Sequence, residues 1–242
     1  AVNASRIHPP VVKRTMAEPG TRWQSVGHLH DLVKDYKGNK WAIAGVSELG
    51  AELDEIPRLK QHLESEGLGM VCTEAASGKK QLSKGGAAIL YDNTKVEFIK
   101  STKCVVFKHR VIKGKFRFLD GSEVWVIAGY MPSGSTTAEH RKAWMAMVKH
   151  TNTQCIVLMD ANGDVQGKGN RGGDHHMKSF MEGTQAHPSP VMDVNKRQVT
   201  CGDDGHIDYI VAGVDVMGKR RGMGTRVGWG DHRVVCAQWA LV

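Results

Sequence analysis

The sequence predicts a single α+β domain spanning residues 1–242, in which strands outnumber helices. Apolar runs of strand length recur along the chain, whereas apolar residues at helical spacing are confined to a few segments. Neither an internal repeat of 20–50 residues nor a Pro- or Ser-rich linker divides the sequence. Hydrophobic residues make up 40% and charged residues 24%, which is typical of globular proteins. We therefore expect one core that needs neither disulfides nor a structural metal.

The first half of the chain is predicted to contain four strands and one helix. Residues 41–47 (WAIAGVS) form an apolar run of the length of a buried strand. Residues 51–67 are expected to form a helix, because Gly67 suits a C-terminal stop and the apolar positions recur at helical spacing. These positions are Leu53, Ile56, Leu59 and Leu63. The other predicted strands span residues 86–91, 96–99 and 105–107.

The second half begins with a predicted hairpin, because Asp120-Gly121 is a turn signal between strands at residues 117–119 and 124–130. Thr136-x-x-Glu139 is a capping box that opens a helix to about residue 149. Trp144 and Met147 are expected to form its core-facing stripe. The remaining elements are a strand at residues 155–159, a helix at 175–183, and strands at 207–212 and 234–239.

The formal net charge of +8 is unevenly distributed. Residues 79–117 carry eleven Lys and Arg residues against Asp92 and Glu97, and a second basic cluster lies at residues 219–226. Such fields attract polyanions, of which nucleic acid is the usual one, although a solubilising surface is the alternative. The second cluster is predicted to be a flexible, Gly-rich loop, with a solvated hairpin as the alternative. The residues predicted to bind nucleic acid are Lys79, Lys80, Lys219, Arg220, Arg221 and Arg226.

Cysteine usage and the lack of long apolar segments predict the cellular compartment of the protein. The five cysteines are odd in number and form no C-x-x-C pair, so small thiols in a reducing compartment are expected. No run of about 18 apolar residues occurs, and no signal peptide is visible. These features predict an intracellular protein without a membrane partner, nuclear if its host is eukaryotic.

Acidic, amide and imidazole side chains stand at the ends of four predicted strands. They are Glu48, Asp160 with Asn162, Asp208, and Asp231 with His232. Strand ends can hold side chains in a precise geometry, and oxygen ligands suit Mg²⁺ or Mn²⁺. A divalent ion held in this way can polarise a phosphoryl group, while a His paired with an Asp can donate to the phosphate or move a proton. The pattern therefore favours a metal-dependent site for phosphate esters.

Five motifs in order give the sequence a family resemblance. They are S-E, G-Y-x-P-x-G, M-D-x-N, H-I-D-Y-I and G-D-H-R. This order resembles the endonuclease/exonuclease/phosphatase superfamily, which includes exonuclease III, apurinic/apyrimidinic endonucleases and the endonuclease domains of LINE-type retrotransposons. The match extends over essentially the whole chain, to His232. It implies a DNase I-like fold: a four-layer α/β sandwich of two packed mixed β-sheets flanked by helices.

The resemblance also implies a role for each motif residue. Asp160 would orient or deprotonate the attacking water, and Asn162 would hold phosphate and water. Tyr130 would hydrogen-bond the scissile phosphate, and Asp208 would orient the catalytic His232. The implied metal ligands are Glu48, Asp231 and Asn3. Departures from the family pattern, such as Ser47 where Gln is common, remove no charged or metal-binding group.

The expected activity is that of a Mg²⁺- or Mn²⁺-dependent phosphodiesterase, a DNA endonuclease that nicks duplex DNA and leaves a 3′-hydroxyl. Residues 170–184, followed by HIDYI, resemble the apurinic, DNA-repair branch and the retrotransposon branch. The alternative is an enzyme of the same superfamily acting on RNA or on a phosphoinositide or phospholipid head group. An inactive binding module is disfavoured, because every expected acid, amide and imidazole is present. A monomeric domain is expected, and a retroelement origin would make it one part of a longer polyprotein.

Overall fold

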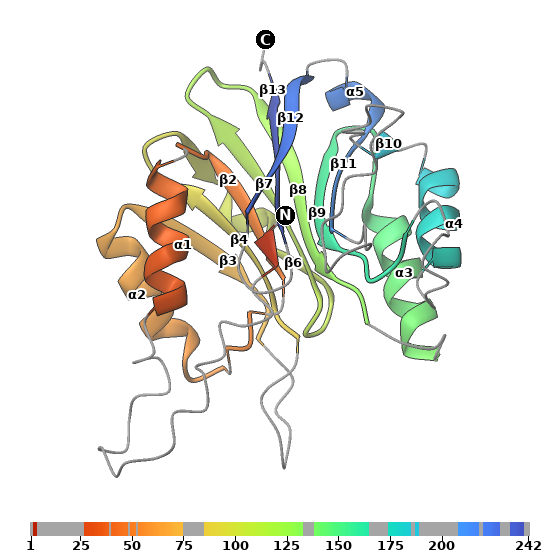
Figure 1. Ribbon diagram of the computed structural model, residues 1–242, viewed down its shortest axis with the longest axis horizontal. Coiled ribbons are helices and arrows are strands. Elements are labelled where there is room, and N and C mark those ends of the chain that lie inside the picture. The colour runs from red at the N-terminus through yellow and green to blue at the C-terminus, as the bar shows by residue number, and fades with distance from the viewer. Residues whose placement is uncertain are drawn as a thin grey trace.

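Two β-sheets stacked face to face, with helices on both outer faces, make up the computed structural model of this chain (Figure 1). The structure describes residues 2–3, 27–38, 40–47, 49–51, 53–74, 85–132, 138–164, 174–184, 187–188, 208–217, 220–227 and 233–239. Each sheet is mixed, because each combines one parallel strand pair with antiparallel pairs. The predicted four-layer α/β sandwich with two packed mixed sheets is thereby confirmed.

The first sheet contains four strands in the order β1-β2-β4-β3. Their bounds are Val2–Asn3 (β1), Ile43–Ser47 (β2), Leu68–Cys72 (β3) and Ala87–Asp92 (β4). Helices α1 (Gly27–Gly38) and α2 (Ile56–Ser65) cover the outer face of this sheet. They bury Tyr36, Leu59 and Leu63 against it, so that the amphipathic faces of both helices meet the apolar face of the strands.

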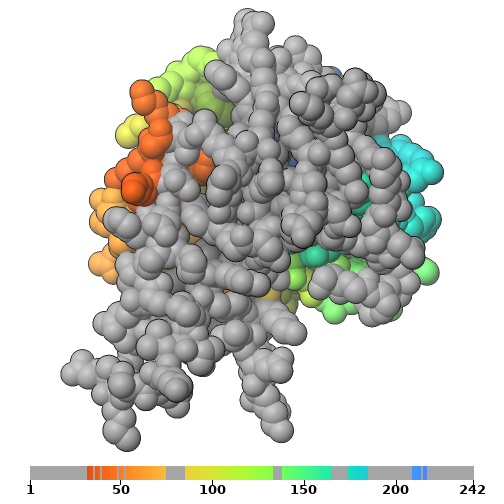
Figure 2. Space-filling view, in the orientation of Figure 1, coloured from red at the N-terminus to blue at the C-terminus, as the bar shows by residue number. Residues whose placement is uncertain are grey.

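The second sheet follows the order β10-β11-β9-β8-β7-β5, with β6 also paired to β7. The bounds are Val96–Phe98 (β5), Cys104–Phe107 (β6), Val111–Phe118 (β7), Glu123–Tyr130 (β8), Cys155–Asp160 (β9), His187–Pro188 (β10) and Asp208–Ala212 (β11). Helices α3 (Ala138–His150) and α4 (Asp174–Thr184) cover its outer face through Trp144, Met147 and Phe180. Helices α2 and α4 are visible on opposite flanks of the molecule (Figure 2). Strands β8 and β9 are parallel, since α3 carries the chain back between them.

Apolar side chains fill the space between the two sheets, among them Ile89, Val126 and Leu158. The sheets come very close at Gly45 of β2, where an added Cβ would overlap the Cβ of Leu158 in β9. Because glycine has no Cβ, it allows β2 and β9 to pack this closely. The contact lies two residues before the last residue of each strand, Ser47 in β2 and Asp160 in β9.

The prediction of a flexible loop at residues 219–226 is wrong, because Arg220–Val227 forms strand β12, which agrees with the alternative of a hairpin. It pairs antiparallel with β13 (Arg233–Trp239), and β13 also contacts β1 and β11. The two glycines and three arginines of this segment suggested a loop, but pairing with β13 makes it a strand, with a register shift between Arg220 and Gly222. The arginines are therefore carried on a strand, while Lys219 lies outside the described residues.

Other predicted elements shift at their ends. The helix expected from residue 51 begins at Ile56, because Pro57 suits the first helical turn, and Leu53 lies in the preceding turn with 72% of its surface exposed. The strand expected at residues 117–119 is the end of the longer β7. The turn at Asp120-Gly121 is confirmed, with Gly121 at a φ of 84°. Helix α1 and strand β3 were not predicted. The remaining short elements are α5 (Val214–Met217) and the 3₁₀ turn η2 (Lys100–Thr102).

The thiols that the structure describes are free, with Cys72 and Cys155 buried and Cys104 half-buried. Burial raises the pKa of both buried thiols, so they pack as small apolar groups, as expected. Within the described residues, no helix has the length and apolar character required to cross a membrane.

Candidate active site

Three of the predicted site residues occupy one row across the second sheet. Tyr130 at the end of β8 is the register partner of Asp160 at the end of β9, and Asp160 is also the partner of Asp208 at the start of β11. Because β11 runs antiparallel to β9, its first residue lies beside the last residue of β9. Residues from distant parts of the sequence therefore meet at one end of the sheet.

The turn after β9 fixes the predicted catalytic pair. Asp160 is 2% exposed, and one carboxylate oxygen accepts a hydrogen bond of 2.9 Å from the backbone amide of Asn162. Asn162 adopts a φ of 47°, a left-handed conformation that Asn tolerates better than most residues. Its side-chain amide donates to the carbonyl of Met131 at 2.7 Å, and the Met131 amide donates to the carbonyl of Asp160 at 2.9 Å. The two side chains are thus held by the end of β8.

Ser47, at the end of β2, joins the first sheet to this row. Its buried hydroxyl donates to the carbonyl of Gly129 at 3.0 Å and accepts from the amide of Asp160 at 3.3 Å. Ser47 immediately precedes the predicted metal ligand Glu48, which itself lies outside the described residues. The residue that replaces the family's usual Gln is therefore a structural bridge between the two sheets.

The remaining predicted site residues are placed by backbone alone or lie outside the described part. Asn3 of β1 pairs with Ser47, so its backbone is beside the end of β2. Asp231 and His232 lie outside the described residues, and β13 begins at the next residue, Arg233. Since β13 contacts both β1 and β11, the strand that follows this motif lies near the row formed by Asp160 and Asp208.

Metal binding stays a prediction. In the described part of the chain, no group of three His, Cys, Asp or Glu residues could hold an ion. Of the three predicted ligands, Glu48 and Asp231 lie outside that part, and Asn3 is described by its backbone. The match between these residues and a metal ion therefore depends on the chemistry of their donor atoms. Two carboxylates and an amide are hard oxygen donors that suit Mg²⁺ or Mn²⁺.

Arg110 and Glu139 are neighbours of the site that the sequence did not single out. The Arg110 guanidinium carbon lies 5.3 Å from the ring centroid of Tyr130, and its Nε donates to Glu139 at 3.1 Å. The Arg110 carbonyl also accepts a hydrogen bond from the Tyr130 amide at 2.9 Å. In the sequence Arg110 was one of eleven basic residues, and Glu139 was read as a capping residue, so no pattern connected them.

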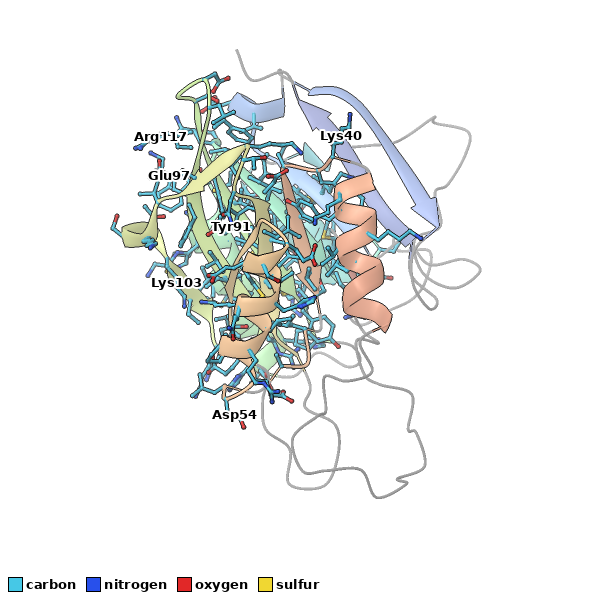
Figure 3. The ribbon with its side chains drawn as sticks, turned by 90° about the vertical axis from the view of Figure 1, so that its left-hand side faces the viewer. Lys40, Asp54, Tyr91, Glu97, Lys103 and Arg117 are labelled. Atoms are coloured by element: carbon cyan, nitrogen blue, oxygen red, sulfur yellow. The ribbon has the colours of Figure 1, made fainter. Side chains whose placement is uncertain are left out.

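In the folded structure, acidic side chains neutralise part of the positive charge of residues 79–117. Lys115 and Arg117 both pair with Glu123, and Arg117 also pairs with Glu97 at 3.1 Å (Figure 3). Lys113 is buried, donates to the carbonyl of His150 and lies 4.4 Å from the Trp125 ring centroid. The count of charges within the segment therefore overstates its positive charge, because Glu123, which lies beyond it, pairs with two of its basic residues. Lys79 and Lys80 lie outside the described residues.

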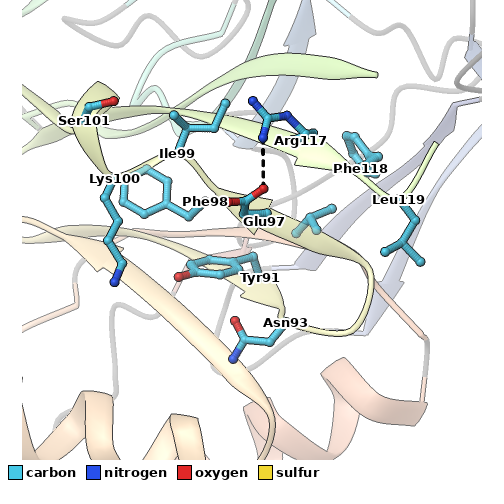
Figure 4. A pocket seen from close by; sticks show the side chains of 11 residues that line it. Tyr91, Asn93, Glu97, Phe98, Ile99, Lys100, Ser101, Arg117, Phe118 and Leu119 are labelled. Atoms are coloured by element: carbon cyan, nitrogen blue, oxygen red, sulfur yellow. Dashed lines mark hydrogen bonds and ion pairs between the residues drawn. The ribbon is translucent and has the colours of Figure 1, made fainter. Parts of the chain in front are cut away.

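A cavity of about 790 Å³ lies away from the candidate site (Figure 4). It is lined by Tyr91, Phe98 and Arg117 among others. Tyr91 pairs with Ile43, the first residue of β2, and Arg117 pairs with Glu123, the first residue of β8. Because Ser47 and Tyr130 are the last residues of the same strands, the cavity and the candidate site occupy opposite ends of the sandwich.

His140 and His176 lie between α3 and α4, and His140 contacts the segment that binds the Asn162 side chain. His140 of α3 is buried and contacts the carbonyl of Pro132, next to Met131. The His176 ring of α4 stacks on Trp144 with centroids 6.3 Å apart. Burial, followed by the nearby His175, His140 and Arg141, lowers the pKa of His176 below its ordinary value of 6.5. The neutral imidazole is therefore the form that this interface favours.

No protein-family model matches the sequence, and no curated protein matches it either. Solved structures do match the fold. The 3′ phosphatase NExo from Neisseria, bound to a product DNA hairpin, has a TM-score of 0.66 at 15% identity, covering 89% of this chain and 95% of its own. The endonuclease domain of the telomere-specific non-LTR retrotransposon TRAS1 has a TM-score of 0.61 at 14% identity, covering 85% and 88%.

A third similar structure is the AP endonuclease LMAP from Leishmania major. Its TM-score is 0.65 at 11% identity, with 86% of this chain and 81% of that chain covered. Identities of 11–15% over this coverage reflect a shared fold. This chain has the fold of the endonuclease/exonuclease/phosphatase superfamily.

Proposed function

We propose that this protein is a Mg²⁺-dependent DNA endonuclease that nicks duplex DNA and leaves a 3′-hydroxyl. The observation that carries the proposal is the row of Tyr130, Asp160 and Asp208 at one sheet end, bridged to the end of β2 by Ser47. Described residues from four of the sequence motifs support it, namely Ser47, Tyr130, Asp160 and Asp208. The similar structures include an endonuclease domain, an AP endonuclease and a phosphatase bound to DNA, which favours DNA over other phosphate esters.

In the proposed reaction, a water oxygen attacks phosphorus in line and the bond from phosphorus to the 3′-oxygen breaks. Asp160 orients the water and accepts its proton, because its carboxylate is buried and fixed by the Asn162 amide. Tyr130 and Asn162 hold non-bridging oxygens, and Asp208 orients His232 toward the phosphate. A bound Mg²⁺, held by Glu48, Asp231 and Asn3, would neutralise the charge that develops on the phosphate.

The test is a cleavage panel run with Mg²⁺ or Mn²⁺ and repeated with EDTA. Its substrates are supercoiled plasmid, a duplex with one abasic site, single-stranded RNA and a water-soluble phosphoinositide. We expect nicked plasmid with 3′-hydroxyl ends and no product in EDTA. Comparison of the abasic and intact duplexes separates an apurinic endonuclease from a retrotransposon type.

Asp160→Asn is the matched variant, because it keeps the side-chain shape and removes the proton acceptor. We expect a rate about 10²–10⁴-fold lower, with the melting temperature nearly unchanged. Asp54→Asn, at an exposed turn before α2, is the control and should retain full activity. Cleavage of RNA or phosphoinositide alone would refute the DNA assignment, and full activity of Asp160→Asn would refute its role as proton acceptor.

A further inference from the structure

The turn between β6 and β7 is placed against both sheets at the candidate site. His109, at a φ of 63°, accepts a hydrogen bond from the Gly86 amide at its carbonyl. Gly86 and Gly85 in turn accept hydrogen bonds from the amides of Leu49 and Gly50, just after β2. On its other side, the Arg110 carbonyl accepts from the Tyr130 amide. The backbone of Arg110 is therefore fixed beside the last residue of β8.

The Arg110 side chain is also held in place, but its ion pair with Glu139 is weak. The guanidinium lies over the Tyr130 ring, and the Arg110 side chain is 19% exposed. Its ion-pair partner, Glu139 of α3, is 60% exposed and accepts through the single Nε donor. Solvent-exposed ion pairs contribute little to stability, so little free energy opposes an exchange of this carboxylate for another anion.

One donor of Arg110 has no partner within the described residues. Its Nη1 is buried and has no hydrogen-bond partner there. A buried donor left unsatisfied is unfavourable, and a buried charged group is more so. A guanidinium presents its donors as a fork that matches two oxygens of one phosphate. Arg110 thus has a rigid position, an unsatisfied donor and an exchangeable carboxylate, all beside Tyr130.

We propose that Glu139 is a built-in competitor that holds Arg110 until a phosphate of the substrate backbone replaces it. This inference depends on the proposed function, because the replacing anion is a phosphodiester of duplex DNA. The guanidinium stays over Tyr130 throughout, and the exchange replaces one carboxylate contact with a charge-assisted contact that also uses Nη1. The Glu139 carboxylate, on the exposed N-terminal turn of α3, returns to water.

The experiment measures duplex DNA binding by fluorescence anisotropy in EDTA, so that no turnover occurs. Glu139→Gln removes the competing charge, and Gln preserves the second half of a capping box. We expect Glu139→Gln to lower the Kd about threefold to tenfold at low salt, because its carboxylate no longer competes. Arg110→Ala should raise the Kd about tenfold, and Arg110→Lys should recover part of this loss.

The double variant Arg110→Ala/Glu139→Gln is decisive. If Glu139 acts through Arg110, the double variant binds no more tightly than Arg110→Ala. Glu182→Gln, an exposed acid on α4, controls for the general effect of removing a negative charge. Equal tightening by Glu139→Gln with and without Arg110 would overturn the proposal, as would a wild-type protein that binds no duplex. A wild-type protein that shows this coupling but cleaves nothing would refute the proposed catalysis alone.

Discussion

Ser47 shows how one hydroxyl can couple the two sheets at the candidate site. It is buried, and it contacts Gly129 and Asp160, which follow it by 82 and 113 residues in the chain. Loss of the hydroxyl would leave the carbonyl of Gly129 and the amide of Asp160 without this partner. The side chain thus affects both the stability of the fold and the position of the catalytic carboxylate.

We therefore predict that Ser47→Ala lowers the free energy of unfolding by about 1–3 kcal/mol, the usual cost of leaving buried polar groups unsatisfied. Nicking activity should fall as well, because the Asp160 amide loses a restraint. Urea denaturation measures the first effect and plasmid nicking the second. Ser101→Ala, at an exposed position in η2, should stay within about 0.5 kcal/mol of wild type. Equal stability of the two variants would contradict this role of Ser47.

Sequence motifs predicted Asp160, Asn162 and Tyr130 because the residue types themselves carry the chemistry. The structure places them at one sheet end, as the prediction required. Ser47, Arg110 and Glu139 could not be found in this way. Their importance comes from contacts across 29 to more than 100 residues of chain, and no local pattern records such contacts.

At the level of elements, helix α4 and the core-facing stripe of α3 were predicted correctly, whereas helix α1 and strand β12 were not. Helix α4 appears at Asp174–Thr184, within one residue of its predicted ends. The expected stripe of Trp144 and Met147 is buried. Helix α1 was not predicted, although its apolar residues Leu29, Leu32, Val33 and Tyr36 recur at helical spacing. Strand β12 was misread because glycine content suggested a loop, and only pairing with β13 makes the segment a strand.

The close approach of β2 and β9 gives a prediction at this scale. Gly45→Ala would place a methyl group on the Cβ of Leu158, and a fixed Cβ cannot rotate away. We expect a loss of about 1–3 kcal/mol in the free energy of unfolding, together with reduced activity as β2 moves from β9. Gly38→Ala, where nothing lies within 4 Å of an added Cβ, is the matched control. If Gly45→Ala were as stable as the wild type, the sheets would pack more loosely at Gly45 than the structure shows.

The α3–α4 interface gives a prediction about pH. The pKa of His176 is lowered mainly by burial, so the folded state favours the neutral form. Above the unfolded value of about 6.5, the stabilisation is fully present, and it is lost as the pH falls through the folded pKa. We expect the melting temperature to drop between about pH 7.5 and pH 5, and His176→Gln to reduce this drop. His62→Gln, at an exposed position of α2, should leave the pH dependence unchanged.

For the whole molecule, the four-layer sandwich was implied by the family resemblance and is confirmed. The distribution of charge was not predictable, because it depends on which acids fold against the basic segment. Glu123 neutralises Lys115 and Arg117 at the end of the sandwich opposite the site. We therefore expect the residues of β12, rather than those of β7, to contribute most to attraction of a polyanion.

Salt dependence of duplex binding tests this expectation. The logarithm of the association constant should fall linearly with the logarithm of salt concentration, by about 0.9 per phosphate neutralised. Arg226→Gln should reduce the slope by about one, whereas Lys115→Gln should leave it unchanged, because Lys115 is paired with Glu123. Titrations between about 50 and 200 mM salt measure both slopes. The reverse order of effects would place the DNA on the opposite end of the sandwich.

The row of Tyr130, Asp160 and Asp208 draws on three strands, and its bridge to β2 spans more than a hundred residues. Contacts between such distant segments form late in folding, since a large loop entropy must be overcome first. Neither half of the polypeptide holds the complete row and its bridge. Catalytic competence and the docking of the two sheets should therefore be acquired together, in the same slow step of refolding.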